Sequence, residues 1–194
     1  MALEIQPPGE RPPPEMAVSL AEAKTYLKAI GNGEDATITM MIEAAQLKIE
    51  HAVDRLLIAR SCRFTTDAFG NEVLLPVRPV AAEGVIVKYM DTAGDEQTLD
   101  PARYRLVDRL ERPRIVPAPG ASFPSTWELP GGVVVEFTAG YGTTGANVPT
   151  DLRIAILKLV RDTWSFRGDV ATARISSLPD GVQATINDYR RWVV

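Results

Sequence analysis

The sequence predicts an α+β fold, in which two N-terminal and two C-terminal helices form a helical core with an inserted antiparallel β-rich section. Apolar residues recur every three or four positions over residues 18–60 and 149–192, as in amphipathic helices. Residues 61–140 are instead split into short β-rich segments by glycine, proline and aspartate. Neither βαβ units nor a repeat is visible, which disfavours a doubly wound sheet and a solenoid.

The N-terminus differs in composition from the rest of the chain. We expect residues 1–17 to be a proline-rich extended arm, because proline fixes φ and removes a backbone donor. The arm is expected to be free or to lie on a neighbour, and removal of residues 1–15 is expected to leave the fold intact. Residues 18–192 are predicted to be a single domain, made of helical residues 18–60, the β insertion 61–140 and helical residues 149–192.

Two helices are predicted before residue 60. Ser19 and Glu22 have the spacing of a capping box at the start of a helix over residues 20–29. Asn32 and Asp35 then offer a second start, for a helix of about six turns. Its buried stripe is predicted to contain Ile38, Met41, Ile42, Ala45, Ile49, Ala52, Val53 and Leu56.

Seven segments of the middle section are predicted to be strands. They are residues 62–69, 72–77, 84–91, 96–99, 104–108, 113–118 and 133–138. A hairpin loop is expected at residues 91–95, with Gly94 at a positive φ. A calcium site at Asp91, Asp95 and Asp100 is disfavoured, because the alternating ligand spacing and terminal glutamate of a coordinating loop are missing.

Two further helices are predicted after the β section. The first begins at Thr150, and its buried face is predicted to contain Leu152, Ala155, Ile156, Leu159, Val160, Thr163 and Phe166. Residues 168–181 break the period. A last helix can start at Asp180 and bury Val182, Ile186 and Tyr189, with Trp192 as a further candidate.

The stretch from Gly140 to Gly145 has the form G-x-G-x-x-G, which also occurs at dinucleotide sites. That fingerprint requires its third glycine in the first helical turn and an acid at the end of a following strand. Here four residues separate Gly145 from Thr150, and no strand is expected after the helix. We therefore interpret the stretch as a tight strand exit, with Gly140 and Gly142 at φ values that favour glycine.

No catalytic, cofactor-binding or metal-binding residue is predicted. Cys62 is the only cysteine and is interpreted as a small buried hydrophobe. His51 is the only histidine and is expected at the edge of the buried face of its helix. Glu43, Glu50 and Asp54 are expected on the polar side of the same helix, facing solvent or a partner.

Composition excludes several classes of protein. The net charge is −4 and no stretch collects five or six basic residues, so tight DNA binding by the monomer is disfavoured. Trp164 and Phe166, with Arg161 and Arg167 beside them, are expected at the core boundary of a helix and not at a nucleic-acid site. No apolar run approaches the roughly 20 residues of a membrane span and no signal peptide is apparent, so we expect an unexported protein without a membrane partner.

Several stretches, taken together and in order, resemble one family. They are Val18-Ser-Leu-Ala-Glu-Ala-Lys-Thr-Tyr-Leu27, Gly33-Glu-Asp-Ala-Thr-Ile38, Leu75-Pro-Val-Arg-Pro79, Val87-Lys-Tyr-Met-Asp91 with Gln97-Thr-Leu-Asp-Pro101 and Tyr104, and Phe137-Thr-Ala-Gly-Tyr-Gly142 with Val148-Pro149. This order resembles the tailed-phage head–tail connector (adaptor) family, in particular its phiE125 gp8-like branch, which includes adaptors of gene transfer agents. The resemblance covers residues 16–192.

The resemblance implies a structural protein without catalysis or cofactor. Such adaptors form a ring, commonly a dodecamer, beneath the portal protein, extend the channel for double-stranded DNA and dock the next tail-side connector, the stopper protein. It places the chain in a virion or phage-like particle that is assembled in the host bacterial cytoplasm.

Two alternatives remain open at this stage. A DNA-binding packaging accessory protein is suggested by basic residues around the β section, although acids are interleaved with them: Arg103, Arg105, Arg109, Arg112 and Arg114. A small hydrolase would require a pocket that unites acids scattered along the sequence.

Overall fold

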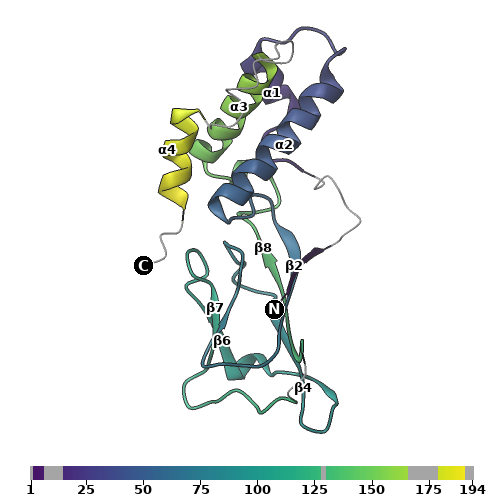
Figure 1. Ribbon diagram of the computed structural model, residues 1–194, viewed down its shortest axis with the longest axis vertical. Helices are drawn as coiled ribbons and strands as arrows, with labels where there is room; N and C mark the ends of the chain where they lie inside the picture. Colours follow the sequence, from purple (N-terminus) through teal and green to yellow (C-terminus); the bar gives the residue numbers. More distant parts are fainter. Residues whose placement is uncertain (1, 7–14, 128–129, 166–178, 191–194) are drawn as a thin grey trace. The chain divides into compact units, whose positions relative to one another are not determined.

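The described chain begins with a short strand, followed by two helices, a section of antiparallel strands and two further helices (Figure 1). The computed structural model describes residues 2–6, 15–127, 130–165 and 179–190. The predicted α+β class is confirmed. Where the sequence suggested one domain over residues 18–192, the chain divides into two compact units. The described residues within 1–11 and 59–140 form the β unit, and those within 12–58 and 141–194 form the helical unit.

The helical unit contains four α-helices in its described part, and their positions agree with the prediction, except that α2 ends before the predicted stripe residue Leu56. They are α1 (Leu20–Leu27), α2 (Asp35–Val53), α3 (Thr150–Ser165) and α4 (Asp180–Tyr189). α2 and α3 make the most extensive helix contact, and α1 and α4 each pack on both of them. Their shared core is apolar and includes Ile38, Ile42, Ile49, Leu152, Ile156, Val160, Val182 and Ile186.

The expected cap of α1 is confirmed, whereas that of α2 differs. Ser19 accepts a hydrogen bond from the Glu22 N–H, and the Glu22 carboxylate accepts one from the Ser19 N–H (2.9 Å). α2 has no side-chain cap. The Asn32 side chain instead accepts a hydrogen bond from Lys24 Nζ (3.1 Å), and Lys24 also pairs with Asp35 (2.6 Å). A basic residue of α1 thus holds the chain that leads into α2.

The β unit contains two antiparallel sheets among its described residues. The first has the order β1-β2-β8-β4-β5 and the second the order β3-β7-β6. The bounds are β1 Ala2–Gln6, β2 Arg60–Thr66, β3 Val73–Leu74, β4 Ile86–Met90, β5 Glu96–Thr98, β6 Tyr104–Val107, β7 Arg114–Pro117 and β8 Val133–Ala139. All seven strands predicted between residues 62 and 138 are confirmed, most of them shorter than expected.

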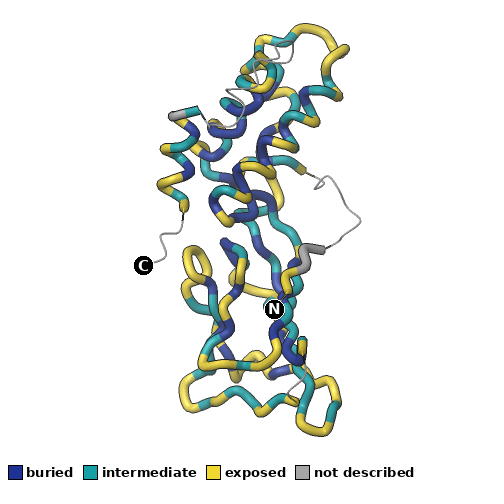
Figure 2. The backbone as a smooth tube through the Cα atoms, viewed as in Figure 1, coloured by how far each residue is buried: buried dark blue, intermediate teal, exposed yellow. Residues whose placement is uncertain are grey.

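The central strand β8 shows why this section folds as a sheet. Val133, Val135, Phe137 and Ala139 are buried, and the residues between them are not, which is the period of two of a strand with one covered face. β8 pairs with β2 on one side and with β4 on the other. In the second sheet, Ile115 of β7 is fully buried. Figure 2 shows buried positions along the strands and exposed ones in the turns between them.

Two details differ here from the sequence analysis. Residues Ala2–Gln6 of the expected arm form β1, which pairs with β2 at the edge of the sheet. Thr163 is exposed, although the pattern placed it on the buried face of α3. Phe166, Arg167 and Trp192, as well as the prolines of the arm, lie outside the described residues. Within the described part, none of the helices combines the length and the apolar character that a bilayer span requires.

Candidate functional site

The glycine-rich turn after β8 is explained by the space and the backbone angles at its glycines. Gly140 has a φ of +133°, a value that favours glycine. A Cβ on Gly142 would lie 2.5 Å from Cγ of Asn147, and one on Gly145 would lie 2.7 Å from the carbonyl oxygen of Ala17. The prediction of a positive φ at Gly142 was wrong, because this glycine is required by close packing and not by its backbone angle.

The same turn lacks the helix geometry of a dinucleotide site. Gly145–Asn147 form a short 3-10 turn, and α3 begins only at Thr150. The free N–H groups of the helix therefore do not follow the third glycine directly, as binding of a pyrophosphate would require.

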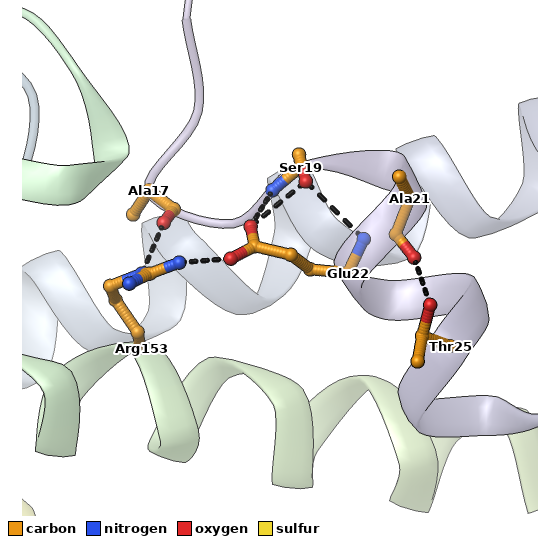
Figure 3. Close-up of polar contacts among 6 residues, drawn as sticks. All are labelled: Ala17, Ser19, Ala21, Glu22, Thr25 and Arg153. Atoms are coloured by element: carbon orange, nitrogen blue, oxygen red, sulfur yellow. Dashed lines mark hydrogen bonds and ion pairs between the residues drawn. The ribbon is translucent and has the colours of Figure 1, made fainter.

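The start of α1 is held by a polar network that joins it to α3 (Figure 3). Arg153 of α3 donates from Nε to the carbonyl oxygen of Ala17 (3.1 Å), and its Nη2 pairs with the Glu22 carboxylate. The backbone N–H of Ser19, aided by its hydroxyl and by Arg153, lowers the pKa of Glu22. Gln46 of α2 accepts a hydrogen bond from the Ala17 N–H (3.0 Å). The segment before α1 is thereby fixed to both long helices.

A surface depression of about 510 Å³ adjoins this network and is lined by residues of the helical unit. Among its described lining residues there is no histidine, cysteine, lysine or tyrosine. The hydroxyl of Ser19 donates to the Glu22 carboxylate (2.8 Å) as part of the cap, and Glu22 is also paired with Arg153. The hydroxyl of Thr39 donates to the Asp35 carbonyl oxygen (2.9 Å) and that of Thr144 to the Asn147 side chain (2.8 Å), so the hydroxyls of the described lining form structural hydrogen bonds.

The largest correction to the predicted surface concerns Glu50. It was expected on the polar side of α2, but its side chain is buried, with 6% of the residue exposed. Its Oε1 accepts hydrogen bonds from the Leu57 N–H (3.0 Å) and from Nε2 of Gln46 (3.2 Å). Asp54, by contrast, is exposed and ends α2 in a left-handed conformation, with a φ of +52°. Glu50 therefore satisfies a buried backbone donor just beyond the helix, which is a structural role.

The single histidine and the single cysteine do not form a catalytic unit. His51 is exposed near the end of α2, further out than the edge position that we expected. Cys62 lies in β2 with 3% of its surface exposed, and burial raises the pKa of its thiol to about 11. The interpretation of Cys62 as a small buried hydrophobe is confirmed. A thiol with this pKa stays protonated near neutral pH, so it is a poor nucleophile.

The acids of the β4–β5 loop have structural partners. Asp91 accepts hydrogen bonds from the backbone N–H groups of Ala93 and Asp95 and from the Gln97 side chain. Its bonds to Asp95 and Gln97 are the main causes that lower the pKa of Asp91. Asp100 accepts from the Ala102 N–H at the start of a 3-10 turn. Across the described ranges, histidines, cysteines and acids form no group of three that is suited to a metal ion.

An aromatic cluster in the β unit was not predicted from the sequence. The rings of Phe69 and Phe123 are stacked at 4.5 Å, and Phe69 meets Tyr89 edge to face at 5.8 Å. Trp127 lies on Gly94, whose φ of +92° confirms the expected hairpin loop. A Cβ at Gly94 would overlap the Trp127 ring. Residues so far apart in sequence leave no periodic signal.

The basic residues around the β6–β7 hairpin do not share one environment. Arg114 pairs with Glu72 (3.3 Å), and Arg103 donates to the carbonyl oxygen of Ser122 (3.2 Å). Three others are exposed and bond through their side chains to none of the residues described: Arg105, Arg109 and Arg112.

The acids interleaved with these arginines are only partly available to neutralise them. The buried Arg78 donates to the carbonyl oxygen of Glu111 (2.9 Å) and lies 3.7 Å from the Glu111 carboxylate. Asp108 is exposed at the turn, with a φ of +49°. The hairpin therefore carries an excess of exposed positive charge.

Solved structures give the most informative comparison, because they cover the whole chain. The chain is similar to a component of the "Virion of native gene transfer agent (GTA) particle", with 32% identity, a TM-score of 0.77 and coverage of 100% of this chain and 97% of the other. It belongs to the family of gene transfer agent neck proteins. Two further GTA neck structures match over the same shares of both chains, each with a TM-score of 0.77. They are the "Neck of empty GTA particle computed with C6 symmetry" (31% identity) and the "Neck of native GTA particle computed with C12 symmetry" (32% identity).

Comparisons of sequence alone say less about this GTA neck protein. No model of a known protein family matches the chain. A human protein, "TATA-binding protein-associated factor 172", is 37% identical over 83 residues, which are 40% of this chain and 4% of that protein. Because the match spans so small a part of the human protein, it carries no statement about the activity of this chain.

Proposed function

We propose that this GTA neck protein is the head–tail adaptor of a phage-like gene transfer particle. In this role, copies of the chain form a ring beneath the portal protein, commonly of twelve. The ring extends the channel for double-stranded DNA and offers a docking face to the stopper protein. The observation that carries the proposal is the similarity along the whole chain to structures of GTA necks, at 31–32% identity.

The arrangement of the described residues supports a structural role. The polar groups around the depression bond to one another, and the buried Glu50 bonds to the backbone. Exposed apolar side chains occur in both units, for example Leu47 and Ile154 in the helical unit and Leu110 and Trp127 in the β unit. Scattered surfaces of this kind suit a protein with several neighbours better than one with a single reacting substrate.

Deletion of the gene in a producing strain tests the adaptor role. We expect DNA-filled heads that carry a portal but no tail, and expression of the full chain should restore tailed particles. Electron microscopy of restored particles should place labelled chain between portal and tail. Tailed, infectious particles in the deletion strain, or label elsewhere than at the neck, would rule out the role.

A second candidate function is a DNA-binding packaging accessory protein. It is favoured by the three exposed arginines of the β6–β7 hairpin, Arg105, Arg109 and Arg112, beside an acid that is already engaged with Arg78. Three phosphate contacts give weak binding with a clear salt dependence, since each contact releases condensed counterions.

A mobility-shift titration separates the two functions. The accessory function predicts that the isolated chain retards duplex DNA at low salt and that retardation falls steeply with added salt. Replacement of the three hairpin arginines by glutamine should abolish it, whereas a matched triple change of Arg63, Arg161 and Arg190 should not. An adaptor that only surrounds passing DNA predicts no retardation by the isolated chain at any salt concentration.

A further inference from the structure

Helix α2 carries apolar side chains on two opposite sides. Its buried side holds Ile38, Ile42 and Ile49, which are at most 1% exposed. The opposite side holds Met40, Ala44 and Leu47, spaced by four and three residues, and Met40 and Leu47 are 61% and 40% exposed. We call these three residues the outer face of α2. Residues at this spacing share one side of a helix and form a seam of the kind that packs against another helix.

Helix α3 also has an exposed side that is partly apolar. Ile154 is 42% exposed and Arg161, seven residues later, is exposed, while Leu157 beside them is half-buried and also packs against the core of the helical unit. We call these residues the outer face of α3. The buried residues of the helix, among them Leu152 and Ile156, lie on its opposite side.

The two outer faces point away from each other. α2 and α3 lie side by side in the helical unit and pack through their buried sides (Figure 1). Each outer face is opposite to the buried side of its own helix, so the pair exposes one partly apolar face on each side. A ring of identical subunits needs such a pair of unlike faces, because each copy contacts its two neighbours head to tail.

One residue beside each face carries a charge opposite to that of the other, and on α2 the exposed Lys48 also adjoins Leu47. Glu43 is half-buried next to the outer face of α2, and Arg161 belongs to the outer face of α3. Neither side chain forms an ion pair with a described residue of its own chain. Opposite charges on the two surfaces favour contact between unlike faces and disfavour contact of either face with itself.

We propose that in the assembled ring the outer face of α2 packs against the outer face of α3 of the next copy. This inference rests on the proposed function, which supplies a second copy on each side of every subunit. The occupant of both faces is therefore the same chain, and Met40 and Leu47 are the anchors of the contact. The full apolar seam is completed only by the neighbour.

Cysteine cross-linking inside assembled particles tests the contact. The double variant Leu47→Cys with Ile154→Cys is expressed in a strain that lacks the wild-type gene, and purified particles are treated with a short bifunctional maleimide. We expect a ladder of covalent multimers on a denaturing gel, because every copy is linked to both neighbours. Both sites are substantially exposed, so the changes should leave the fold intact.

Matched control variants show whether the contact joins unlike faces of neighbouring copies. Either single variant should stay monomeric, and particles that contain both single variants together should give dimers only. Wild-type chain should not react, since Cys62 is buried. The pair Leu47→Cys with Asp188→Cys, which places the second thiol on an exposed site of α4, should give no ladder.

Two results would overturn the inference. One is a monomeric double variant in particles that contain the chain, and the other is a dimer from Leu47→Cys alone, which would mean that α2 packs against itself. Immunoblotting of the particles before cross-linking distinguishes these results from failure of the proposed function, because in that case the chain is missing from the particles altogether.

Discussion

At the scale of residues, Arg153 links three segments of the helical unit. It donates to the Ala17 carbonyl and pairs with Glu22, and Glu22 is also the second half of the α1 capping box. Gly145 lies against the same carbonyl, where a side chain would not fit. The chain before α1 is therefore positioned by close packing on one side and by hydrogen bonds on the other.

Replacement of Gly145 by alanine should destabilise the chain by about 1–3 kcal/mol, the usual cost of overpacking. The new Cβ would lie 2.7 Å from the Ala17 oxygen and 2.9 Å from the Met16 oxygen, and both are backbone atoms that cannot rotate away. Urea unfolding measures the loss. Gly33→Ala is the control, since a Cβ there has no neighbour within 4 Å. Equal midpoints for the two variants would show that the contact is relieved without cost.

Tyr189 should make stability depend on alkaline pH. Burial, together with its hydrogen bond to Asp151 (2.9 Å), raises the pKa of Tyr189 to about 12 from the ordinary 10. A pKa raised by folding means that the folded state holds its proton longer, so this stabilisation is complete below pH 10 and is lost as the pH rises from 10 towards 12. The difference in unfolding free energy between wild type and Tyr189→Phe should shrink over that range. Tyr26→Phe, at an exposed site of α1, controls for loss of a hydroxyl; a constant difference across the range would refute the linkage.

At the scale of elements, the most informative helices and strands are those with a face or an edge that no other described element covers. α2 is covered on one side by α3 and α4, while its outer face exposes Met40 and Leu47. β1 covers one edge of the five-stranded sheet, and β2 would be the edge strand without it. Unpaired strand edges and apolar faces are the surfaces through which proteins associate.

Removal of residues 1–6 should leave a folded chain that associates with itself. β2 keeps its pairing with β8, so cooperative melting should persist, as the sequence analysis expected for a longer truncation. The backbone groups of β2 that pair with β1 become free to bind another strand. Light scattering over a range of protein concentrations should show rising mass for the truncated chain. The full-length variant Leu3→Ser, which keeps the backbone pairing, is the control, and a truncated chain that stays monomeric would contradict the expectation.

At the scale of the whole molecule, assembly depends on many weak contacts. The chain folds as two compact units, and each has its own exposed apolar residues. In a ring, every copy makes the contact once with each of its two neighbours. A neighbour that is already bound raises the effective concentration of the next copy. Strong assembly therefore does not require a strong contact between two isolated copies.

The isolated chain should be a monomer in solution at micromolar concentration. Stable interfaces bury about 800 Å² on each partner, and the three side chains of the outer face of α2 supply far less than that. Light scattering of the purified chain measures its mass, and addition of portal protein should convert monomer into a large complex. A tight dimer of the isolated chain would argue against closure of the ring on the portal.

Local patterns sufficed to predict most elements. Ser19 and Glu22 predicted the start of α1, and the spacing from Ile38 to Val53 predicted α2, because a helix places residues three and four apart on one side. The strands were predicted from short β-rich segments bounded by glycine, proline and aspartate, and the burial of alternate residues from Val133 to Ala139 agrees with this prediction. The separation of Gly145 and Thr150 along the sequence predicted that the glycine-rich turn is not a dinucleotide site. The close packing against Asn147 that requires a glycine at position 142 could not be predicted.

Contacts between distant segments remained out of reach of the sequence. Glu50 looked like a surface acid, but the path of the chain after α2 brings the Leu57 N–H to its carboxylate. β1 was taken for part of an extended arm that is free or lies on a neighbour, since a strand that pairs at an edge is recognised only by its partner. Met40 and Leu47 were simply off the predicted stripe, and only the packing of α2 on α3 shows that they face outward together.

The sequence by itself determined the fold class, the order of the elements and the likeness to head–tail connectors, because all three depend on residue spacing along one chain. The tertiary structure alone decided which polar groups form hydrogen bonds within the chain and which apolar side chains remain exposed. That division depends on which segments, distant in sequence, fill the space around each side chain.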